Sequence, residues 1–114
     1  MIIEYKKEKL GNFIPYALNG NALTFKSGLT IALDRYERDN AAHYDVCSDK
    51  FGCLVMGVIP GVAELYVAQI DIPARQYIEV DSGEVDDDGE PKFVPEAVPF
   101  DTDNVTLTLW GQED

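Results

Sequence analysis

Acidic residues crowd the stretch from Glu79 to Glu90, where seven of the twelve side chains are carboxylates. Carboxylate oxygens beside a glycine are ligands that Ca²⁺ prefers, so this stretch is a candidate cation site. The candidate ligands around Gly89 are Glu84, Asp86, Asp88 and Glu90. An EF-hand loop in this register requires a bidentate acid where the chain has Pro95, and no flanking helix is expected. The EF-hand pattern therefore fails.

Two other interpretations of this stretch need no metal. Carboxylates are costly to bury and repel one another. The composition therefore fits a solvated loop that this repulsion keeps extended. The run Asp86, Asp87 and Asp88 is alternatively a docking surface for a basic partner. We expect the solvated loop, with calcium binding and docking as the alternatives.

His43, Cys47 and Cys53 form a second candidate site, an incomplete zinc centre with Asp45 or Asp49 as a fourth ligand. A turn over residues 49–52 would bring the two cysteines near one another across a hairpin. His43 and Cys47 share a strand face, but they are about 13 Å apart in an extended strand. One metal ion cannot span that distance without a sharp bend, so we expect both cysteines to be small core residues.

Nucleophilic catalysis would have to use His43, because it is the only histidine of the chain. No G-x-S-x-G pattern surrounds any serine. The glycines match neither the phosphate-binding loop nor the dinucleotide fingerprint. Acids are plentiful, so glycoside hydrolysis by paired carboxylates is an open alternative. The chain is short and has no recognisable cleft-forming insertion, so we expect no enzymatic activity and no cofactor.

Aromatic side chains are a further candidate for binding, since exposed rings stack on sugars or anchor protein interfaces. The alternation of the final strand places Trp110 on the face opposite Leu109, away from the core. Trp110 therefore joins Asp86, Asp87 and Asp88 as a predicted interaction residue.

Charge is divided unequally along the chain, whose net charge is −12. Acids and bases balance through Gly61, whereas fourteen acids face only Arg75 and Lys92 from Val62 onward. Such a surface repels phosphates and anionic membranes. We expect no direct binding to nucleic acid or membrane, and we expect a protein partner or self-association.

The elements that must position these residues are strands. Apolar residues alternate in short runs separated by glycine and proline turns, and no window of helical length has a 3.6-residue period. Asn19-Gly20 predicts a type I′ hairpin turn. The apolar stretch from Cys53 to Ile72, broken at Pro60-Gly61, predicts a central hairpin of two buried strands. Residues 81–92 are expected as a loop, and 93–100 as an extended edge segment because of its prolines.

At 114 residues the chain fits one domain, 1–114. The predicted fold is all-β: an antiparallel sandwich or partly open barrel of about seven or eight short strands. No stretch is apolar enough to span a membrane and the start lacks the order of a secretory signal, which predicts a cytoplasmic protein with reduced cysteines.

These observations favour a non-catalytic β module that acts through protein–protein contacts, such as a structural or assembly component of virion or mobile-element type. The alternative is a small-ligand module that binds carbohydrate on exposed aromatics or calcium in the acidic loop. A further alternative is an acidic inhibitor that mimics nucleic acid to occupy a basic groove.

Overall fold

The computed structural model describes residues 1–7, 12–26 and 28–112. Strands dominate this part of the chain, and its only helical segments are two short 3₁₀ turns, η2 (Leu33–Tyr36) and η3 (Thr102–Asn104). The strands are β1 (Ile2–Lys6), β2 (Tyr16–Asn19), β3 (Ala22–Phe25), β4 (Thr30–Ala32), β5 (Ala42–Asp49), β6 (Leu54–Met56), β7 (Ala63–Ile72), β8 (Tyr77–Val85), β9 (Pro91–Ala97) and β10 (Thr106–Trp110). The all-β prediction is confirmed, with ten strands in place of the expected seven or eight. Within the described residues, no helix has the length and apolar character needed to cross a membrane.

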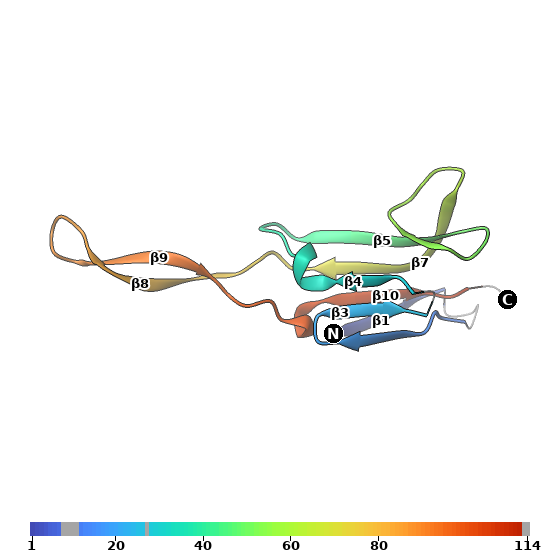
Figure 1. Ribbon diagram of the computed structural model, residues 1–114, viewed down its shortest axis with the longest axis horizontal. Coiled ribbons are helices and arrows are strands. Elements are labelled where there is room, and N and C mark those ends of the chain that lie inside the picture. The colour runs from blue at the N-terminus through green and yellow to red at the C-terminus, as the bar shows by residue number, and fades with distance from the viewer. Residues whose placement is uncertain (8–11, 27, 113–114) are drawn as a thin grey trace.

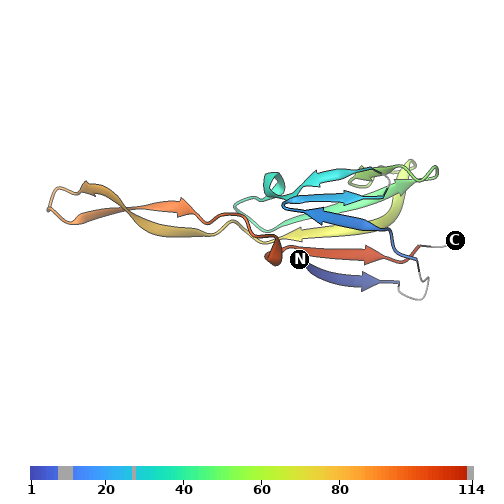
Figure 2. The same cartoon turned by 60° about the horizontal axis from the view of Figure 1, so that its bottom comes forward.

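Two sheets face each other and form the body of the molecule (Figures 1 and 2). The larger sheet has the order β1-β10-β7-β5-β6, and the smaller has the order β2-β3-β4. All neighbours are antiparallel except β1 and β10, which run parallel. The body is therefore a two-layer sandwich.

The core lies between these sheets and follows the alternation in the sequence. Leu107 and Leu109 of β10 and Ile70 of β7 point inward from the larger sheet, and Leu23 and Phe25 of β3 meet them from the smaller one. All five are almost completely buried. Burial of a side chain of this size contributes roughly 1.5–3 kcal/mol, so these residues account for much of the stability of the body.

The hairpin signal at Asn19-Gly20 is confirmed, but its turn type was wrong. Asn19 pairs with Ala22, so the two loop residues are Gly20 and Asn21. Gly20 has φ +58°, whereas Lys7 is the only described non-glycine residue with a positive φ. A positive φ confined to the first loop position fits a type II′ turn, because type I′ requires it at both positions.

The predicted central hairpin from Cys53 to Ile72 was also wrong. β6 and β7 do not form a hairpin; each pairs with β5 instead, and β6 is a half-buried edge strand. The Gly57 amide still donates to the Asp45 carbonyl at 2.7 Å, but Gly57 takes φ +92°, which is not an extended conformation, and β6 ends after three residues. The prediction of a central strand in this stretch is confirmed for β7, which lies at the centre of the larger sheet.

β8 and β9 leave the body and form a separate two-stranded sheet, seen at the left of Figure 1. We call residues 76–98 the arm. The arm makes the molecule 68 Å long, and the radius of gyration is 19.1 Å against about 13 Å for a compact domain of this length. The loop predicted at 81–92 was wrong, because β8 continues to Val85 and β9 begins at Pro91. Cross-strand pairing thus overrides the polar composition.

Candidate protein-interaction site

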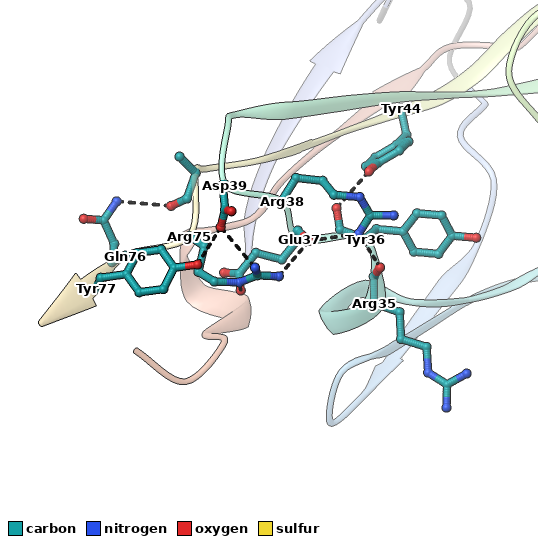
Figure 3. Close-up of polar contacts among 10 residues, drawn as sticks. Arg35, Tyr36, Glu37, Arg38, Asp39, Tyr44, Arg75, Gln76 and Tyr77 are labelled. Carbon is teal, nitrogen blue, oxygen red and sulfur yellow. Dashed lines mark hydrogen bonds and ion pairs between the residues drawn. The ribbon is translucent and has the colours of Figure 1, made fainter. Parts of the chain in front are cut away.

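The root of β8 is tied to the segment that follows η2. The Arg75 guanidinium donates to the carboxylates of Glu37 (3.2 Å) and Asp39 (3.1 Å). The Arg75 amide donates to the carbonyl of Arg38 at 2.8 Å. The Tyr77 hydroxyl donates to the same Asp39 oxygen at 2.7 Å, and Figure 3 shows both side chains converging on Asp39. This network fixes the point at which the arm leaves the body.

The root of β9 is tied down as well. The Val98 amide donates to the Gln76 carbonyl at 2.8 Å, which extends the β8–β9 ladder toward the body. Phe100 packs against the core cluster two residues later. A cavity of about 160 Å³ lies beside this junction, lined in part by Pro73 and Pro99. Both strands of the arm are therefore anchored where they meet the body.

Both faces of the arm carry exposed apolar side chains. The register pairs Ile78 with Glu96 and Val80 with Val94, which places these four residues on one face. The other face carries Tyr77, Glu79, Asp81, Phe93, Pro95 and Ala97. Ile78 is 53% exposed and Phe93 55% exposed. A two-stranded sheet with uncovered apolar faces is only marginally stable in water by itself.

The acidic tip is a turn that closes on itself. One carboxylate oxygen of Asp86 accepts hydrogen bonds from the amides of Asp88 (2.9 Å) and Glu90 (3.0 Å). The Gly89 amide donates to the Asp86 carbonyl, and the side chains of Asp87 and Asp88 are exposed. Across the described residues, no three His, Cys, Asp or Glu side chains are grouped so that they could hold a metal. The proposed calcium ligands Glu84, Asp86, Asp88 and Glu90 are thus near in sequence but are not gathered into one site.

The arm concentrates the negative charge of the chain. Residues 76–98 hold eight acids and one lysine, so the arm carries −7 of the net −12. These acids extend from Glu79 near the root to the tip, and Glu96 lies on the returning strand. The predicted docking acids Asp86, Asp87 and Asp88 therefore sit at the end of a projecting element.

Trp110 lies apart from these acids, because β10 ends on the side of the body opposite the arm (Figure 1). Its ring stacks on Tyr66 with centroids 5.2 Å apart, and Lys6 Nζ lies 5.5 Å from its centroid. The Trp110 indole donates to Gln69 at 2.9 Å. A cavity of about 400 Å³ borders Tyr66 and Trp110. The predicted interaction residues thus fall into two separate places.

His43 belongs to a polar network on the outer face of the larger sheet. Its Nδ1 lies 2.6 Å from an Asp71 oxygen and its Nε2 lies 2.8 Å from an Asp45 oxygen. Gln69 donates to the same Asp45 oxygen at 2.9 Å. The hydrogen bond to Asp71 is the main cause that raises the pKa of His43, and that to Asp45 adds to it. The imidazolium then donates to both carboxylates.

Neither cysteine joins His43. Both are free thiols; Cys47 is buried, as expected, whereas Cys53 is exposed, so its prediction as a core residue was wrong. Burial raises the pKa of the Cys47 thiol, which keeps it protonated. Sequence reasoning missed Asp71 and Gln69 as partners of His43, because they come from β7 through a pairing that no local pattern indicates.

No family model, curated protein or solved structure matches this chain.

Proposed function

We propose that this chain is a non-catalytic β module that acts through protein–protein contact, as a structural or assembly component of the kind found in virions and mobile elements. The arm is its contact element. The observation that carries this proposal is the projection of β8 and β9 from the body with apolar side chains exposed on both faces.

Binding of a partner over the apolar side chains of the arm is energetically favourable. Ile78, Val85 and Phe93 are each more than half exposed, and all three gain stability when a partner removes them from water. Aromatic side chains such as Tyr77 and Phe93 are also enriched where protein interfaces bury most. The anchored root reduces the orientational freedom that binding must remove.

The state of His43 supports a role without catalysis. Both ring nitrogens are held by carboxylates, at 2.6 Å and 2.8 Å. A general base needs a nitrogen free to take a proton from the reacting group. The single imidazole of the chain is therefore engaged in cross-strand pairing between β5 and β7.

The small-ligand hypothesis keeps one specific observation in its favour. The stacked Tyr66 and Trp110 rings border a cavity of about 400 Å³ at the end opposite the arm. Tyr66 is 36% exposed, and an exposed aromatic ring can stack on a sugar ring. Trp110 fluorescence that changes with any member of a glycan panel would support this second function, and a flat response across the panel would remove it.

Two full-length variants with matched composition test the proposed function. The arm variant combines Ile78→Ser, Val85→Ser and Phe93→Ser, and the control combines Phe51→Ser, Val62→Ser and Leu65→Ser, which removes exposed apolar groups from the opposite end. Sedimentation and affinity capture from the native cell are compared with the wild type. We expect the arm variant to lose complexes that the control keeps. Equal complexes for both variants, or a wild type that is monomeric and captures nothing, would overturn the proposal.

A further inference from the structure

We propose that the free edge of β8 receives an extended segment of a basic partner protein as a third strand of the arm. This inference rests on the proposed function, because it takes the arm as the contact element. It adds the mode of binding and the chemistry of the partner.

The hydrogen-bonding register identifies the free edge. The Val98 amide bonds the Gln76 carbonyl, so the pairs that exchange hydrogen bonds recur at every second position, at Ile78/Glu96 and Val80/Val94. The backbone groups of Tyr77, Glu79 and Asp81 therefore point away from β9. The β8–β9 sheet has no third strand in the described residues, so this edge is open.

The opposite edge is blocked. The outward positions of β9 are Phe93, Pro95 and Ala97, by the same alternation. Pro95 has no amide hydrogen, so it removes the central donor that an added strand would need. Prolines on an edge strand are a common protection against unwanted pairing. The arm therefore offers one pairing edge, and that edge belongs to β8.

The acidic side chains of β8 favour a basic partner over a second copy of this chain. Glu79 and Asp81 would lie beside the same residues of a second copy paired through β8, and like charges across a strand pair are unfavourable. The rest of the chain carries a net −5, so the net charge of a second copy opposes its approach to an arm of −7. A Lys- or Arg-bearing segment meets neither obstacle, because its charges pair with these acids.

The two faces of β8 specify the pattern of that segment. Side chains next to Glu79 and Asp81 lie on the acidic side, and those next to Ile78 and Val80 lie on the apolar side. An added strand that alternates Lys or Arg with Val or Ile satisfies both faces at once. A segment in which the basic residues are contiguous has the same charge, but it does not place its basic side chains on the acidic side and its apolar side chains on the apolar side.

Amide exchange measured by NMR tests this binding mode with a synthetic probe. The probe is the capped peptide Gly-Lys-Val-Lys-Ile-Lys-Gly, and its control has the same composition with the lysines in one block. We expect the alternating peptide to slow exchange at Tyr77, Glu79 and Asp81 by about tenfold or more at saturation, because these amides gain acceptors. Exchange at Ile78 and Val80 should change little, since their amides already face β9.

Two substitutions separate the edge from the charge. Glu79→Gln removes one carboxylate and keeps the outward amide, and we expect affinity for the peptide to fall by roughly threefold. Glu79→Pro also removes the amide, and we expect a further loss of roughly fivefold. Retained amide exchange protection at Ile78 and Val94 verifies that the hairpin of each variant is intact.

Several results would overturn the inference. Equal binding of the block peptide, protection confined to β9, or no binding of the alternating peptide would each exclude strand addition by a basic segment. Protection of Tyr77, Glu79 and Asp81 that grows with protein concentration alone would assign the edge to a second copy. If these results occur while the apolar arm variant still loses its complexes, the proposed function stands and only the binding mode falls.

Discussion

Tyr77, the first residue of β8, donates its hydroxyl to Asp39 at 2.7 Å, so a contact between the arm and the body lies at the point of departure. Arg75 Nη1 reaches the same carboxylate oxygen at 3.1 Å. Asp39 follows η2, far from the arm in sequence. Asp39 thus receives two of the contacts that hold the root of an element that otherwise extends into solvent.

Loss of this contact should loosen the arm without unfolding the body. We expect Tyr77→Phe to broaden the distribution of distances between spin labels on Cys53 and on a cysteine introduced by Asp87→Cys, and Arg75→Ala to broaden it further. Cys53 is exposed and Cys47 is buried, so the labels go to the intended sites. Tyr16→Phe, which removes an exposed hydroxyl from β2, is the control. Equal distributions for Tyr77→Phe, Arg75→Ala and the control would show that the root network does not orient the arm.

Stability should depend on pH through His43. Its pKa is raised above the ordinary 6.5, so its contribution is complete below that value and is lost as pH rises through the raised pKa. The pKa of Asp45 is lowered from 3.8, mainly by the hydrogen bond from Gln69, so its contribution is lost as pH falls through the lowered value. The side chain of His43 is 48% exposed, so we expect its effect on the unfolding free energy to stay below about 1 kcal/mol.

The single histidine makes this prediction direct to measure by NMR titration. We expect the pKa of His43 to lie above 6.5 and to fall in Asp71→Asn, since Asp71 is the main cause of the shift. The matched control is Asp101→Asn, because Asp101 bonds its own turn at Asp103. A His43 pKa that is unchanged in Asp71→Asn would contradict the paired network.

The core should be sensitive to truncation at Leu107. This side chain is fully buried in β10, and Leu→Ala at such a site costs about 2–5 kcal/mol of unfolding free energy. Leu65→Ala is the matched control, because Leu65 is 62% exposed and its loss should cost less than about 0.5 kcal/mol. Chemical denaturation of both variants measures the difference, and similar costs would contradict the assigned inward faces.

Calcium should leave the melting temperature unchanged. Asp86 already uses one carboxylate oxygen to close the tip turn, and the described residues offer no group of metal ligands. Thermal unfolding with about 1 mM calcium and with chelator should therefore coincide, because a ligand that binds only the folded state would raise the midpoint. A clear rise with calcium, lost in Asp86→Asn, would restore the cation hypothesis.

Short-range patterns in the sequence correctly predicted some strand faces and turns. The alternation of the final strand correctly placed Trp110 on the face opposite Leu109, away from the core, and Asn19-Gly20 located the β2–β3 turn. These predictions held because side-chain periodicity and glycine conformation act over a few residues.

The arm and the His43 network could not be found in this way. Charged composition indicated a loop at 81–92, whereas pairing of Asp81 with Phe93 makes strands of most of it. His43 meets Asp71 only because β5 pairs with β7, and β6 failed as a partner of β7 because Gly57 turns the chain. Strand partners are chosen by the whole core, and a single sequence does not display that choice.

The central claim, that the arm is the contact element, is tested most directly by site-specific photo-crosslinking in the native cell. A photoreactive phenylalanine derivative replaces Phe93 on the arm or, as the control, Phe51 at the opposite end, which is 80% exposed. We predict a discrete crosslinked protein from position 93 and none from position 51. Adducts from position 51 with none from position 93 would contradict the claim.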